Sequence, residues 1–319
     1  MITAIRTKSL LLTFLLGLIF QYKLAAAKSN VLKSFGQFEQ TEIINEVMKF
    51  DISNSSQHVD SNHLTIFNVN GSIDVEGYGG DEVLIEATKR IFAKTSSSLA
   101  EGLDEIGLKF EQHDRRIFVY LDSPYTYFDR EEGLIWHSET CWRHNDCSRK
   151  HPKRKSYKYH IDITVKVPEK TSLKVSTINN GDIKISGVDA KELNVNNING
   201  AIDMLDVAGQ TTVNAINQDI NITYRNNPIA DSSYESINGD LKIKYAGQPN
   251  ANVVYQTMHG ELYSAYEVSM LTPQVHRTSK RKEHGIQYKL DAASRLKIGK
   301  GGPEYRFNTL NGDIKIQRQ

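Results

Sequence analysis

A short motif recurs along this chain: an Asn-Gly pair, then a small or acidic residue, then alternating apolar and polar residues. Its copies begin at Asn70, Asn180, Asn199, Asn217, Asn238, His259 and Asn311, with Gln218 in place of glycine in the fourth copy. The second motif position recurs at residues 181, 200, 218, 239 and 260, a spacing of 19, 18, 21 and 21 residues. A period near twenty is typical of repeat architectures, in which each unit buries its apolar face against its neighbours.

Two kinds of β-structure can use this period. If each Asn-Gly closed a tight hairpin, the flanking strands would pair with each other in an antiparallel sandwich or barrel. If each marked the corner of a coil, every strand would pair with its equivalent one coil later. Because apolar positions recur in register well beyond the turn, we predict the second: an all-β, parallel β-solenoid (β-helix) of roughly 20-residue coils, with one short helix and two inserted loops.

The recurring apolar positions predict two columns of side chains in the core. One column is Ile178, Ile198, Ile216 and Ile237, and the other is Ile183, Ile202, Ile220 and Leu241. At the corners, Asn and Gly tolerate the positive φ angles of a sharp turn. Stacked Asn side chains are expected to hydrogen-bond from one coil to the next.

The segments before the coils also have a defined order. Strand-like alternation in "LTIFNVNGSIDVEGYGGDEVLIEATKR" is followed by the helical pattern "SSSLAEGLDEI", for which Ser98 and Glu101 predict a capping box. Strands resume in "ITVKVPEKTSLKVSTINNGDIKISG" and lead into the coils. This order resembles the putative-adhesin β-strand-repeat family of secreted bacterial proteins, domains of unknown molecular function. The resemblance covers most of residues 60–316 and implies a β-solenoid outside the cytoplasm.

The N-terminus has the features of a secretory signal peptide. Arg6 and Lys8 precede an apolar run over residues 10–20, and the alanines at 25–27 offer a cleavage site. A retained membrane anchor is the alternative, but the apolar run is short for a bilayer span. Removing residues 1–27 takes away three basic residues and no acid, so the formal charge changes from +1 to −2. We therefore expect an exported protein, periplasmic or extracellular at the cell surface, with no integral membrane span after cleavage and no nucleic-acid partner.

The predicted organisation has four parts. These are a signal peptide (1–27), N-terminal strands with the short helix (28–122), an insertion with the cysteine pair (123–156), and the coils (157–319) with a second insertion near 266–304. In the first insertion, Cys141 and Cys147 favour a local disulfide in an exported chain. A zinc or copper site is the alternative, because His137, His144 and His151 flank the pair.

The two insertions also carry the candidate ligand-binding residues. They are Trp142, His144, Arg149, Lys150, Lys153 and Arg154 in the first, and Arg277, Lys280 and Arg281 in the second. Such basic clusters on a slightly acidic body can attract acidic or phosphorylated glycans or an anionic membrane, or can be solvated loop charges.

The sequence pattern that would support catalysis is less specific than the basic clusters. Asp182, Asp219, Asp240 and Asp313 can form a carboxylate ladder able to hold calcium, although Lys184, Lys242 and Lys315 are placed to neutralise it. No catalytic sequence motif is present. We therefore predict a non-enzymatic protein without a cofactor, which offers an adhesion or structural surface to a surface glycan, an envelope component or a protein. The alternative is a glycan-active enzyme, a polysaccharide lyase or hydrolase on the same scaffold.

The cysteine pair gives the first testable prediction. Mass spectrometry of the exported protein should find Cys141 and Cys147 joined, with no stoichiometric metal, because an oxidising compartment favours the disulfide. Two free thiols together with one bound zinc would reverse the assignment.

Overall fold

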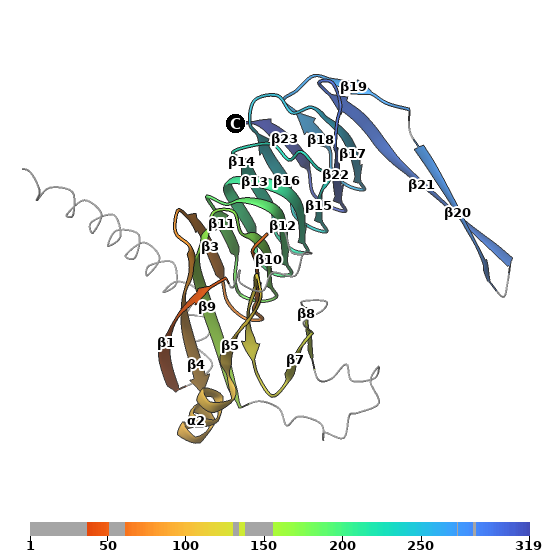
Figure 1. Cartoon of the computed structure of the whole chain (residues 1–319). Helices are drawn as coiled ribbons and strands as arrows, with labels where there is room; N and C mark the ends of the chain where they lie inside the picture. The colour runs from red at the N-terminus through yellow and green to blue at the C-terminus, as the bar shows by residue number, and fades with distance from the viewer. Residues whose placement is uncertain (1–36, 51–60, 130–133, 138–155, 273, 283–284) are drawn as a thin grey trace, which may run out of the picture.

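The structure is a computed structural model that describes residues 37–50, 61–129, 134–137, 156–272, 274–282 and 285–319. Within these residues the fold is all-β apart from one helix, α2 (Ser96–Glu105). Two ladders of strands, sheet A and sheet B, run side by side along an elongated body (Figure 1). The pairing is mixed: it is parallel along the middle of both ladders, and antiparallel at the N-terminal end of both and at the C-terminal end of sheet B.

Sheet A starts at the N-terminal end of the body. Its strands, in spatial order, are β1 (Phe38–Lys49), β4 (Glu82–Ala93), β9 (Tyr157–Pro168), β3 (Ile73–Tyr78), β11 (Ile183–Ser186), the first part of β13 (Ile202–Ala215), β14 (Ile220–Tyr224), β16 (Leu241–Tyr245), β23 (Ile314–Arg318) and β18 (Leu262–Ser264). Every pair from β9 to β18 is parallel, whereas β4 pairs antiparallel with both β1 and β9. Helix α2 packs on this antiparallel end.

Sheet B follows the same direction. Its strands, in spatial order, are β5 (Gly107–His113), β6 (Arg116–Asp122), β2 (His63–Phe67), β10 (Ser172–Thr177), β12 (Asp189–Asn197), the second part of β13, β15 (Ser232–Ser236), β22 (Glu304–Thr309), β17 (Ala251–Thr257), β21 (Gly285–Ile298) and β19 (Val268–Met270). Pairs from β6 to β17 are parallel, and antiparallel strands close both ends.

The second predicted column of core residues is confirmed. Ile183, Ile202, Ile220 and Leu241 are parallel partners in successive coils, and each is fully buried. Their strands alternate buried and partly exposed residues, as a sheet with one face on the core requires.

The first predicted column is confirmed only at Ile178, which is half-buried and packs against the core. Ile198 and Ile237 are 37% and 43% exposed, because they lie at the corner between the sheets. The inward position just before each is occupied by a buried polar residue, Asn197 or Ser236. Each of these side chains accepts a hydrogen bond from the corner amide three residues later, at 3.1 Å for Gly200 and 3.0 Å for Gly239. The polar residue therefore takes the core position that the isoleucine was expected to fill.

The corner glycines have a different role from the predicted one. Among the motif copies, positive φ angles occur at Gly71 and at Asn180, whereas the other motif glycines have ordinary angles. Instead, a Cβ atom on Gly239 would lie 2.0 Å from the carbonyl oxygen of Gln218 in the neighbouring coil. Glycine is needed because the backbones of adjacent coils approach each other directly.

The predicted asparagine ladder is confirmed, with Asn179 rather than Asn180 as its first member. Side-chain hydrogen bonds of 2.7, 2.6, 3.0 and 2.7 Å join Asn179, Asn199, Asn217, Asn238 and Asn311 in that order. The last of these hydrogen bonds, between Asn238 and Asn311, shows that the order of the coils in space differs from their order in the sequence. The C-terminal coil, β22 with β23, lies between the coil of β15 and β16 and the coil of β17 and β18.

Two local predictions are corrected. The helix is present, but its N-cap is Thr95, whose side chain accepts a hydrogen bond from the Ser98 amide, and not Ser98 with Glu101. The second insertion is not a loop: β20 (Gln274–Lys282) and β21 form an antiparallel hairpin that projects from the C-terminal end of the body (Figure 1). A smaller hairpin joins β7 (Thr126–Asp129) and β8 (Leu134–His137) in the first insertion.

The close approach at the corner gives the second prediction. Gly239→Ala should destabilise the fold by about 1–3 kcal/mol, because the added methyl group forces two coils apart. Gly79→Ala is the matched control, since a Cβ atom there meets nothing within 4 Å. Equal melting temperatures for the two variants would contradict direct backbone stacking.

Candidate functional site

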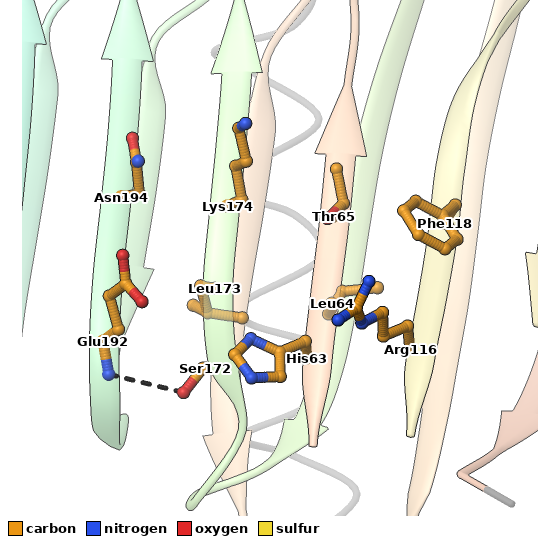
Figure 2. Close-up of a pocket in the computed structure, with 10 residues that line it drawn as sticks. All are labelled: His63, Leu64, Thr65, Arg116, Phe118, Ser172, Leu173, Lys174, Glu192 and Asn194. Atoms are coloured by element: carbon orange, nitrogen blue, oxygen red, sulfur yellow. Dashed lines mark hydrogen bonds between the residues drawn. The ribbon is translucent and has the colours of Figure 1, made fainter. Parts of the chain in front are cut away.

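A shallow depression lies on the outer face of sheet B, near its N-terminal end (Figure 2). Its volume is about 250 Å³. Ten residues from four adjacent strands line it: His63, Leu64, Thr65, Arg116, Phe118, Ser172, Leu173, Lys174, Glu192 and Asn194. Most of them are polar, so the depression is suited to a polar ligand.

Parallel register brings these residues together. His63 of β2 is the partner of Arg116 on one side and of Ser172 on the other. Because side chains alternate along a strand, His63 and Thr65 face outward while Leu64 between them is fully buried in the core. The chain therefore builds a rigid polar face from segments that are far apart in sequence.

A short hydrogen-bonded chain lies at one end of the depression, where β2 and β10 begin. The Ser61 Oγ lies 3.1 Å from His63 Nε2 and 3.4 Å from the Ser172 Oγ. The Ser172 Oγ also accepts a hydrogen bond of 3.3 Å from the Glu192 amide (Figure 2). These contacts fix the imidazole against the strand face.

The charge state of His63 follows from its surroundings. Burial lowers the pKa of His63 below its ordinary value, and the positive charge of Arg116 adds to this effect. The negative charge of Glu192 opposes it. His63 is therefore neutral at pH 7, and the positive charge of the depression comes from Arg116 and Lys174.

An aromatic cluster stands beside the depression. Phe128 of β7 stacks on Tyr120 with 4.1 Å between the ring centroids, and it meets Phe118 edge-on at 5.9 Å. Strand β7 therefore packs over the outer face of β6 and forms an apolar border to the polar face.

The predicted carboxylate ladder is present but engaged in the fold. Asp219 accepts a hydrogen bond of 2.9 Å from the Asp240 amide and pairs with Lys242 at 2.6 Å. Asp240 repeats this pattern with the Asp313 amide at 3.0 Å and with Lys315 at 2.8 Å. Burial opposes ionisation of Asp240, but the Lys315 ion pair and the amide outweigh it and hold the pKa of this carboxyl below its usual value. The described part of the chain holds no cluster of three or more His, Cys, Asp or Glu side chains suited to a metal.

The sequence-predicted site residues lie elsewhere. Trp142, His144, Arg149, Lys150, Lys153, Arg154 and the cysteines Cys141 and Cys147 fall outside the described residues. Arg277, Lys280 and Arg281 lie on β20, opposite Leu290, Gln287 and Ile286 of β21. Both sets remain predictions. Sequence reasoning missed the depression, because nothing local shows that β2 pairs with both β6 and β10.

The architecture is that of an all-β repeat protein, in which successive coils pair in parallel along the middle of both sheets. Residues 160–317, from β9 to β23, match the family model Toastrack DUF4097. The resemblance seen in the sequence is thereby confirmed for this part of the chain, although the match starts later than residue 60. No curated protein matches the chain.

Several solved structures align along most of the chain. A putative cell adhesion protein from Clostridium sporogenes is 12% identical, with 87% of this chain and 100% of that one covered and a TM-score of 0.40. A putative lipid binding protein from Parabacteroides distasonis is 11% identical, with coverages of 89% and 97% and a TM-score of 0.30. A putative adhesin from Bacteroides fragilis is 12% identical, with coverages of 87% and 97% and a TM-score of 0.28. Superpositions this loose transfer no function to the chain.

In the described ranges, no helix has the length and apolar character needed to cross a bilayer.

The lowered pKa of His63 gives the third prediction. Below pH 6.5 the unfolded chain takes up a proton at His63 more readily than the native protein does, so stability should fall as the pH decreases. His63→Gln should flatten this part of the melting-temperature profile between pH 7.5 and pH 5. Identical profiles for the variant and the parent would show that the native imidazole titrates normally.

Proposed function

We propose that this protein is an exported, non-enzymatic β-solenoid that provides an adhesion or structural interaction surface. Three observations support the proposal: the family match, the parallel coils in the middle of both sheets, and the signal-peptide pattern of the N-terminal sequence. Stacked coils yield long, rigid, regularly spaced faces, which are suited to binding extended partners.

The outer face of sheet B is the proposed contact surface, and its depression is the proposed site. The observation that carries this is the placement of Arg116 and Lys174 on β6 and β10, with β2 between them. Two strand spacings and an offset of two residues along the strands put the backbones of these cations roughly 12 Å apart on a rigid scaffold. Such a pair suits a glycan that carries carboxylate or phosphate groups, and the neutral His63 adds a hydrogen-bonding group between them.

A glycan-active enzyme is the second candidate. The observation in its favour is the Ser61–His63 contact of 3.1 Å, a distance at which an imidazole can act as a general base. Against it, Glu192 is the one carboxylate among the residues that line the depression, whereas most glycosidases use a pair. A binding surface accounts better for the residues present.

A glycan array probed with purified residues 28–319 tests the proposal and gives the fourth prediction. Acidic or phosphorylated glycans should bind, and Arg116→Glu with Lys174→Glu should weaken binding at least tenfold, because each cation becomes an anion. Lys244→Glu is the matched control, since Lys244 is exposed on sheet A.

Each other outcome has a distinct meaning. Unchanged binding by the double variant would move the site away from the depression. Release of new reducing ends or of unsaturated sugars from a bound glycan, lost in His63→Gln, would favour the enzyme instead.

A further inference from the structure

A second surface runs along the corner where sheet B passes into sheet A. One aliphatic side chain per coil forms it, and we call this column the aliphatic ridge: Ile178, Ile198, Ile216, Ile237, Leu310 and Met258, in spatial order. Ile198, Ile237, Leu310 and Met258 are 37%, 43%, 39% and 69% exposed, and the other two are half-buried. An ordered apolar column in contact with solvent is characteristic of an interaction site.

Backbone hydrogen bonds hold the ridge straight. The Asn217 amide donates to the Ile198 carbonyl at 3.1 Å, and the Asn238 amide donates to the Ile216 carbonyl at 2.9 Å. The same contact continues from Asn311 to Ile237 at 2.9 Å and from His259 to Leu310 at 3.0 Å. Six coils at the usual strand spacing make a ridge about 24 Å long and one side chain wide.

Neutral polar groups border the ridge on both sides. On the sheet A side runs the asparagine ladder, in which every side-chain amide after Asn179 donates one hydrogen bond to the previous coil. Each NH₂ group has a second hydrogen, and each carbonyl oxygen a second lone pair, for an external partner. On the sheet B side lie Asn196, Asn214, Glu235, Asn308 and Gln256, which are half-buried or exposed, together with the buried Ser176. Glu235 is the one charged residue in these two rows.

We propose that the aliphatic ridge binds a neutral linear polysaccharide. A pyranose ring with equatorial hydroxyls has apolar C–H faces and a polar rim. Its face can pack on the methyl groups of the ridge while hydroxyls on both edges reach the amides alongside. The ligand is neutral because the two bordering rows contain no Lys or Arg that could pair with an anionic polymer.

Other occupants fit this surface less well. A stable protein interface buries about 800 Å² on each partner, and a strip about 24 Å long and one side chain wide offers far less. A membrane surface with anionic lipids is held mainly by Lys and Arg, and neither bordering row contains one. The inference rests on the proposed function in treating the protein as a binding module, but it uses a different surface and a different ligand charge.

Isothermal titration calorimetry on purified residues 28–319, with cellohexaose and chitohexaose as probes, tests the proposal. At least one of them should bind, and Ile198→Asp with Ile237→Asp should weaken that binding at least tenfold. Both side chains are exposed, so the double variant should fold, which its melting temperature checks. Leu205→Asp with Ile229→Asp is the matched control, because these side chains are 60% and 95% exposed but lie off the ridge.

The contrary results are equally specific. No binding of either probe, or equal loss in the ridge and control variants, would overturn the proposal. Sedimentation that shows a dimer abolished by the ridge variant would make the ridge an interface between copies, and flotation with phosphatidylcholine vesicles abolished by it would make the ligand a membrane. Arg116→Glu should leave oligosaccharide binding intact, which separates this proposal from the site on sheet B.

Discussion

The fold depends on the direct contact of one coil's backbone with the next at the corner between the sheets. A Cβ atom on Gly200 would lie 1.9 Å from the Gly181 carbonyl oxygen, so a side chain at that position would separate the coils. The same contact between coils also determines which side chains are exposed at the corner. The corner amide must be satisfied, and Asn197 or its equivalent turns inward to do so. The following aliphatic residue is left at the corner, and the aliphatic ridge results.

A stack of parallel coils also needs closed ends, because an open strand edge invites further pairing. At the N-terminal end, Asp162 of β9 accepts hydrogen bonds from Ser72, His160 and Arg90, which joins β9 to β4 and to the start of β3. Burial opposes ionisation of Asp162, but His160 and the hydrogen bonds from Ser72 outweigh it and hold the pKa of Asp162 well below the usual range. On the helix side, the buried Lys89 donates to the Leu103 and Ile106 carbonyls and pairs with Glu42. These contacts hold the helix and the antiparallel strands together.

The repeat period made part of the stacking of the coils predictable from the sequence. The column from Ile183 to Leu241 follows from alternation and spacing alone, and so does the asparagine ladder. The same spacing could not tell that Ile198 lies outside the core, because its column has the same period and only the hydrogen bond from Gly200 to Asn197 distinguishes it. Nor could spacing place the coil of β22 and β23, since residue 312 follows residue 260 in sequence but precedes it in the stack. The depression depends on pairings of β2 with distant strands, for which the sequence has no local signal.

The order of the coils allows the most direct test of this account. Asn238 and Asn311 are neighbours in the ladder, with 2.7 Å between their side chains, whereas His259 lies one coil further on. Paired cysteines at 238 and 311 should therefore form a disulfide on mild oxidation, detected by peptide mapping. Cysteines at 238 and 259 should not, because two strand spacings, about 10 Å, exceed the reach of the bond. A disulfide between 238 and 259 but not between 238 and 311 would contradict the stacking order.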